Sequence, residues 1–267
     1  MISGNGKYRL QDPIFQKGLL SGLEAACDTD GIEGCLVGGG AIQSYTADPA
    51  LRRSTLDVDV QSLGYARKAQ RTEWGVRTAE SLKDRGITNT SKKKTRSGAE
   101  VRIETGDIPF YVHLDIFTNA YVKEHDPWIQ ESRERMRDLE VEHGKEGMSY
   151  KVQAPEDVAY HKLQRLIQAL DTERLSAEDR QVVKLIASGL VDDVNVGDMQ
   201  ERLSEVERLR TMSMEEISRE GFSRTRRLYL EHKDQKNLYD VLLLVHGHRE
   251  SENGLFDEPN IIRRNIA

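Results

Sequence analysis

The stretch Arg53-Ser54-Thr55-Leu56-Asp57-Val58-Asp59-Val60 decides what fold and chemistry this chain is expected to have. From Leu56 to Val60 aliphatic and acidic residues alternate, which is typical of a β-strand with one buried face. Residues i and i+2 of a strand project to the same side, about 6–7 Å apart, so Asp57 and Asp59 should present two carboxylates together. Because adjacent anions repel, this pattern indicates a cation site. Two exposed acids on a solvated edge strand are the alternative.

A glycine-rich segment precedes this strand. Cys35-Leu36-Val37 has the pattern of a short buried strand that runs into Gly38-Gly39-Gly40, and a helix is expected to begin within Ala41 to Tyr45. Glycine has no side chain, so backbone amides at such a turn and at a helix N-terminus can approach phosphate oxygens closely. The segment is neither a Walker sequence nor a dinucleotide fingerprint, because it lacks their spacing. A plain tight turn is the alternative.

A third carboxylate is expected on a neighbouring strand. Val101-Arg102-Ile103, a turn at Thr105-Gly106-Asp107 and the run from Ile108 to Phe117 predict a β-hairpin. In its second arm Phe110, Val112, Leu114 and Ile116 share one face, and Tyr111, His113, Asp115 and Phe117 share the other. Asp115 should therefore face outward. With the pair at 57 and 59 it would complete a site for two Mg²⁺ or Mn²⁺ ions about 3.5–4 Å apart.

Composition limits the classes of protein that need to be considered. The chain has 267 residues, of which 37% are hydrophobic and 31% charged, and its formal net charge is −6. No apolar run approaches the roughly 20 residues of a membrane span, and the N-terminus lacks the pattern of a signal peptide. Two cysteines exclude a disulfide scaffold. These features predict a soluble, cytoplasmic protein with no membrane association.

Periodicity predicts an α+β fold in two parts. A mixed α/β domain is expected over residues 1–150 and a helical domain over residues 151–267, with no strand after residue 153. Helical spacing is found in Asp12–Ala26, Thr72–Arg85, Pro155–Leu170, Glu178–Ser188, Asp198–Arg210, Ser213–Arg219, Ser223–His232 and Asp234–His246. Lys92 to Gly98 is expected to be a solvated loop.

The motifs together resemble those of a known group. Leu36 to Ala41, then Arg53 to Asp59, then Leu114-Asp115-Ile116 are similar to the nucleotidyltransferase superfamily related to DNA polymerase beta. The Arg-x-Thr-x-Asp-hydrophobic-Asp order most resembles AbiEii-type toxins of toxin–antitoxin and phage-defence pairs. The resemblance implies a nucleotidyltransferase-type mixed β-sheet with flanking helices, followed by a C-terminal helical domain.

The resemblance also implies roles for single residues. Asp57, Asp59 and Asp115 would be catalytic and bind the metals, and Lys162 would be catalytic and contact phosphate. The residues implied to bind the nucleoside triphosphate are Gly38, Gly39, Gly40, Arg53, Thr55, Lys162 and Asp179. In the segment around Asp179 this chain departs from the family pattern, because Glu178 stands in place of a lysine and Val182 in place of a second acid.

The implied reaction is transfer of a nucleoside monophosphate from a triphosphate, ATP among them, to an acceptor. Two cations would neutralise the negative charge that develops on the α-phosphate and on the departing pyrophosphate. The resemblance favours tRNA or another macromolecule as acceptor and a cognate antitoxin as partner. The basic segment Lys92–Arg96 fits such a polyanion, although a solvated loop explains it equally well. The alternatives are an aminoglycoside-type small-molecule nucleotidyltransferase and a non-catalytic nucleotide-binding module.

Overall fold

The computed structural model describes residues 8–30, 32–46, 52, 55–65, 67–105, 109–117, 137–143, 146–170, 175–188, 234 and 236–244. The chain divides into two compact units. One comprises Met1–Ser44 and Arg52–Ala154, and the other Tyr45–Leu51 and Pro155–Ala267. The sequence analysis predicts a domain boundary at residue 150. The assignment of the first part as a catalytic domain and of the second as a helical domain stays a prediction. Within the described residues, no helix is both long enough and apolar enough to cross a membrane.

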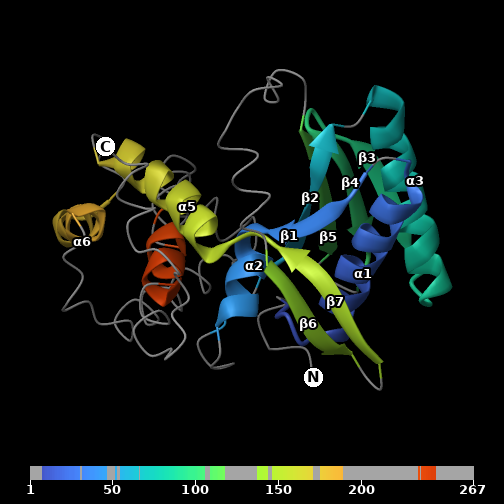
Figure 1. Cartoon of the computed structure of the whole chain (residues 1–267), viewed down its shortest axis with the longest axis horizontal. Coiled ribbons are helices and arrows are strands. Elements are labelled where there is room, and N and C mark those ends of the chain that lie inside the picture. Colours follow the sequence, from blue (N-terminus) through green and yellow to red (C-terminus); the bar gives the residue numbers. More distant parts are fainter. Residues whose placement is uncertain are drawn as a thin grey trace, which may run out of the picture. The chain divides into compact units, whose positions relative to one another are not determined.

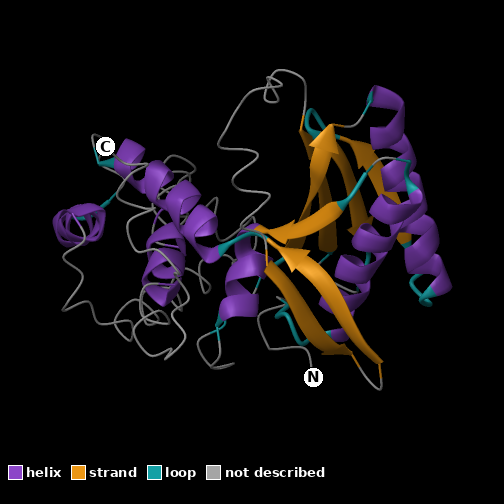
Figure 2. Ribbon diagram, viewed as in Figure 1, coloured by secondary structure: helices purple, strands orange, loops and turns teal. Residues whose placement is uncertain are grey.

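The first unit is built on one mixed β-sheet (Figures 1 and 2). Its strands are β1 (Gly34–Val37), β2 (Asp57–Tyr65), β3 (Thr90–Lys94), β4 (Gly98–Ile103), β5 (Phe110–Phe117), β6 (Arg137–His143) and β7 (Glu146–Val152). They lie in the order β3-β4-β5-β2-β1-β7-β6. Strand β2 is central, parallel to β5 and antiparallel to β1. The strand that carries both aspartates is therefore held on each side.

Helices α1 (Pro13–Asp28) and α3 (Lys68–Asp84) pack together against one face of the sheet (Figure 1). Glycines let α1 approach closely, because a Cβ at Gly18 would lie 2.9 Å from Phe110 and a Cβ at Gly22 would lie 3.1 Å from Val60. Trp74 of α3 is fully buried, and its Nε1 donates a hydrogen bond to the Gly22 carbonyl oxygen at 2.8 Å. The apolar face of β2 is thereby buried, and its acidic face is the opposite one.

Most of the local structure expected around the sheet is confirmed. The hairpin forms as β4 and β5, which are antiparallel, and Phe110, Val112 and Leu114 are fully buried as the alternation predicts. The chain after α3 turns at Gly86, which has φ +81°. The loop predicted at Lys92–Gly98 is wrong in part, because Thr90–Lys94 forms strand β3 and pairs with β4. A lysine-rich strand has no apolar face, so the alternation rule does not detect it.

The second unit is helical in its described residues. Helix α5 (Pro155–Ala169) begins with Pro155 and two acids in its first turn, as expected at a helix N-terminus. Helix α6 spans Ala177–Ser188, and residues 234 and 236–244 are also helical. Ala159, Leu163 and Leu166 of α5 are buried, in keeping with the helical spacing predicted over Pro155–Leu170. The helices predicted between residues 198 and 232 lie outside the described residues.

Candidate metal centre

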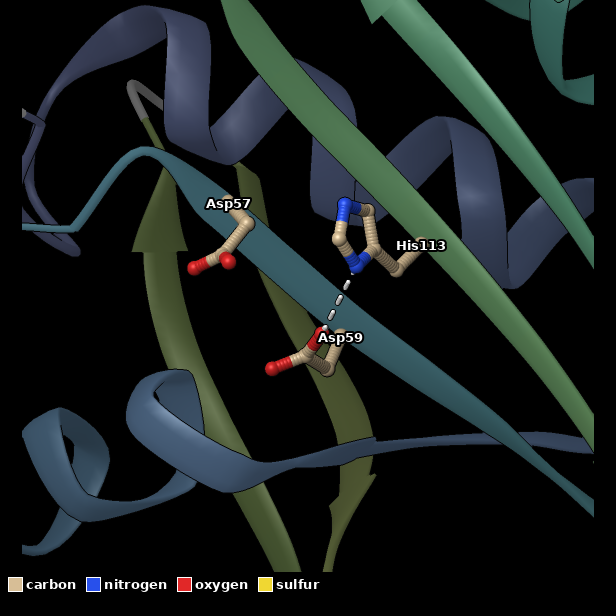
Figure 3. A group of neighbouring side chains, drawn as sticks. All are labelled: Asp57, Asp59 and His113. Carbon is tan, nitrogen blue, oxygen red and sulfur yellow. Dashed lines mark ion pairs between the residues drawn. The ribbon is translucent and has the colours of Figure 1, made fainter. Parts of the chain in front are cut away.

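Asp57 and Asp59 lie two residues apart on β2 and face the side of the sheet opposite the buried Val58 and Val60 (Figure 3). His113 of β5 lies beside them, with its Nδ1 atom 3.5 Å from Asp59 Oδ1. Each of the three residues offers one ligand atom, and these atoms lie within 4.8 Å of one another. In the part of the chain that the structure describes, this is the group of His, Cys, Asp or Glu side chains that could hold a metal ion. All three are partly exposed, so a solute ion can reach them.

Thr55 fixes the orientation of Asp57. Its Oγ1 hydroxyl donates a hydrogen bond to Asp57 Oδ1. Thr55 is itself buried and anchored by an isolated bridge to Tyr8, whose amide donates to the Thr55 carbonyl oxygen at 2.8 Å and whose carbonyl oxygen accepts from the Thr55 amide at 2.7 Å. Thr55 thus holds the Asp57 carboxylate in place, and its role toward a nucleotide stays a prediction. Arg53 lies outside the described residues.

The glycine segment adjoins Asp59. Val37, the last residue of β1, is the register partner of Asp59, and helix α2 (Gly38–Tyr45) starts at the next residue. Gly38 has φ +62°, and a Cβ there would lie 2.7 Å from Asp59 Oδ2. The expectation of a separate glycine turn followed by a helix from Ala41 is therefore wrong. The glycines form the first turn of the helix, and Gly38 admits both the backbone conformation and the carboxylate.

Gly39 and Gly40 belong to that first turn. Amides of a first helical turn have no partner within the helix, so they are available to an anion. Gly40 also has a packing role, because a Cβ there would lie 2.6 Å from Leu36 Cδ1 and 3.1 Å from the ring of Phe15. The Asp59 carboxylate and the helix N-terminus are consequently immediate neighbours.

Asp115 does not join this group. It lies on the same face of β5, but its register partner on β2 is Gln61, whereas His113 is the partner of Asp59. Ser97 Oγ donates a hydrogen bond to Asp115 Oδ1 at 2.6 Å. The group that the structure brings together consists of two carboxylates and an imidazole, and the metal role given to Asp115 stays a prediction. The sequence did contain a signal for His113, which shares the outward face of the strand with Asp115.

Lys162 and Asp179 belong to the second unit. Lys162 Nζ donates hydrogen bonds to Asp240 Oδ2 at 2.8 Å and to Asn237 Oδ1 at 3.2 Å. Asp179 is buried in the first turn of α6, and its amide donates to Ser176 Oγ at 3.0 Å. The contacts of Lys162 join α5 to the helical residues 236–244, and the contact of Asp179 caps the start of α6. The roles of Lys162 and Asp179 toward a nucleotide stay predictions.

The donor set suits a divalent cation. Carboxylate oxygens are preferred by Mg²⁺ and Mn²⁺, and imidazole nitrogen is a common ligand of transition metals. The missing Cβ of Gly38 leaves the space that the Asp59 carboxylate occupies. The residue types of this group therefore fit a divalent metal.

Neither a protein-family model nor a curated protein matches the sequence. Among solved structures, an antigenic nucleotidyltransferase-like protein from Paracoccidioides brasiliensis aligns at 16% identity and a TM-score of 0.35, over 59% of this chain and 69% of that one. The solution structure of the antibiotic-resistance factor ANT(2'')-Ia aligns at 14% identity and a TM-score of 0.35, over 74% and 97%. The crystal structure of ANT(2'')-Ia with adenylyl-2''-tobramycin aligns at 16% identity and the same TM-score, over 74% and 99%. Similarity this low assigns no function, which must come from the site itself.

Proposed function

We propose that the chain is a metal-dependent nucleotidyltransferase, which transfers a nucleoside monophosphate from a triphosphate to an acceptor and releases pyrophosphate. The observation that carries this proposal is the contact between Asp59 and Gly38, at which a Cβ would lie 2.7 Å from the carboxylate. It joins the proposed paired-aspartate metal site to a helix N-terminus whose first-turn amides have no partner within the helix. A triphosphate with its counter-ion needs both features in one place.

Each residue of the site then has its own role in the reaction. Asp57 and Asp59 hold the divalent cation, which when bound neutralises charge on the phosphates and aligns the attacking hydroxyl. The amides of Gly38, Gly39 and Gly40 bind the β- and γ-phosphate oxygens, which become the leaving pyrophosphate. Thr55 keeps the Asp57 carboxylate aimed at the site.

The resemblance supplies further roles that the described geometry leaves as proposals. Asp115 is assigned to the base side of the attacking hydroxyl. Arg53, Lys162 and Asp179 are assigned to the nucleotide.

A polyanionic acceptor such as tRNA is favoured by strand β3. Lys92, Lys93 and Lys94 are all exposed on this edge strand of the same unit. Nucleic acid would gain from these cations by releasing its counter-ions, whereas a polycationic aminoglycoside would gain nothing from them. A toxin role with a cognate antitoxin rests on the AbiEii-type resemblance.

The test compares α- and γ-labelled nucleoside triphosphates. The full chain is incubated with Mg²⁺ or Mn²⁺, total RNA and a cell extract, and an Asp57→Asn, Asp59→Asn double variant is the control. The proposal expects the α-label on an acceptor, release of pyrophosphate and no transfer by the double variant. Transfer of the γ-label would identify a kinase instead, and nucleotide binding without transfer would identify a binding module.

A further inference from the structure

His113 lies between two acids across three neighbouring strands. Its register partner on β2 is Asp59 and its register partner on β4 is Glu100. The Nδ1 atom is 3.5 Å from Asp59 Oδ1, and the Nε2 atom is 3.7 Å from Glu100 Oε2. One ring nitrogen therefore faces the paired aspartates, and the other faces a separate carboxylate (Figure 3 shows the first of these contacts).

We propose that His113 is the third protein ligand of the metal, through Nδ1, and that Glu100 positions its ring through Nε2. The inference rests on the proposed function and specifies its metal site. Histidines that bind metals usually present their second nitrogen to a carboxylate or a carbonyl, which fixes the tautomer and the ring orientation. Glu100 supplies that carboxylate from the adjoining strand.

The donor atoms lie close to the spacing of ligands around one ion. Ligand atoms about 2.1 Å from an octahedral ion lie about 3 Å apart when adjacent and about 4 Å apart when opposite. One ligand atom from each of Asp57, Asp59 and His113 lies within 4.8 Å of the others. A small movement of side chains brings all three onto one cation.

Asp115 is held elsewhere. It is the register partner of Gln61, and it accepts the hydroxyl of Ser97 at 2.6 Å. Because a strand repeats every two residues, Asp115 shares the face of His113 but lies one full repeat further along β5. Asp115 can thus act on the acceptor side of the reaction without being a ligand of the cation between the aspartates.

An imidazole ligand changes the choice of metal. Oxygen-only sites suit Mg²⁺, whereas imidazole favours transition metals, with Mn²⁺ below Co²⁺ in affinity. The site should therefore bind Mn²⁺ and Co²⁺ more tightly than Mg²⁺. Changing His113 to Asp should shift this preference back toward Mg²⁺, because it restores an all-oxygen donor set.

The experiment uses the full chain and Mn²⁺ alone. Free Mn²⁺ is titrated by continuous-wave electron paramagnetic resonance, and pulsed measurements detect hyperfine coupling between bound Mn²⁺ and ring ¹⁴N. We expect ¹⁴N coupling in the wild type, its loss in His113→Gln, and unchanged affinity and coupling in Asp115→Asn. Glu100→Gln should weaken binding by about 10- to 100-fold, the usual effect of removing the partner of a metal-bound histidine.

The outcomes separate the two proposals. Mn²⁺ binding that depends on Asp57 but shows no ¹⁴N coupling in the wild type would overturn the role of His113 and leave the proposed function standing. Loss of binding in Asp115→Asn, with normal binding in His113→Gln, would likewise overturn the role of His113 alone. Absence of any Mn²⁺ binding by the wild-type chain would overturn both.

Discussion

Gly38 offers the sharpest test of how the backbone builds the site. The change Gly38→Ala places a Cβ on a residue with φ +62° and 2.7 Å from Asp59 Oδ2. The left-handed conformation alone costs a residue with a side chain about 1–2 kcal/mol. The contact adds a second effect, because the Asp59 carboxylate must move away from Gly38. It would then leave the place beside Asp57 from which both carboxylates can bind one cation.

Gly86→Ala is the matched control. Gly86 has φ +81°, and a Cβ there would meet nothing within 4 Å. Both substitutions should therefore lower the free energy of unfolding by about 1–2 kcal/mol in urea titrations. Only Gly38→Ala should also weaken Mn²⁺ binding, measured by electron paramagnetic resonance, and nucleotidyl transfer. Equal Mn²⁺ affinity in the two variants would refute the inference that Gly38 makes room for a functional carboxylate.

Three further predictions test other parts of the molecule. Cys27 is exposed, while burial raises the pKa of Cys35 to about 12, so an aromatic disulfide reagent at pH 8 should titrate one thiol in the native chain and two after unfolding. Lys162→Met should lower the free energy of unfolding in urea by about 3–5 kcal/mol, because it removes the ion pair that Lys162 makes with the buried Asp240 carboxylate. Lys162→Arg keeps the positive charge and is therefore the variant that tests catalysis. Gly98→Ala should lower the urea midpoint markedly, because its Cβ would overlap the Leu114 carbonyl oxygen of β5; an unchanged midpoint would contradict the packing of β4 on β5.

The sequence predicts best where burial and strand period act together. Val58 and Val60 of β2, and Phe110, Val112 and Leu114 of β5, are buried as the alternation requires. Strand β3 was missed because Lys92–Lys94 pairs through its backbone while its side chains stay exposed. Backbone pairing of a polar edge strand leaves no apolar pattern in the sequence.

The sequence pattern also does not determine which side chains meet at the site. Alternation places both His113 and Asp115 on the outward face of β5, but it does not state which of them lies opposite Asp59. That choice depends on the register between β2 and β5, which is set by packing between distant segments. The contact of Gly38 with Asp59 was likewise beyond sequence reasoning, since it depends on the backbone dihedral angle of a single glycine.

The central claim is that Asp57 and Asp59 hold a divalent cation against a triphosphate bound at the Gly38–Gly40 helix start. The most direct measurement is a crystal structure of the full chain with Mn²⁺ and a non-hydrolysable nucleoside triphosphate, with an anomalous difference map at the manganese edge. The claim predicts an anomalous peak coordinated by both aspartates and by phosphate oxygens, with the β- and γ-phosphates against the glycine amides. A triphosphate bound elsewhere, or no manganese between the two carboxylates, would contradict it.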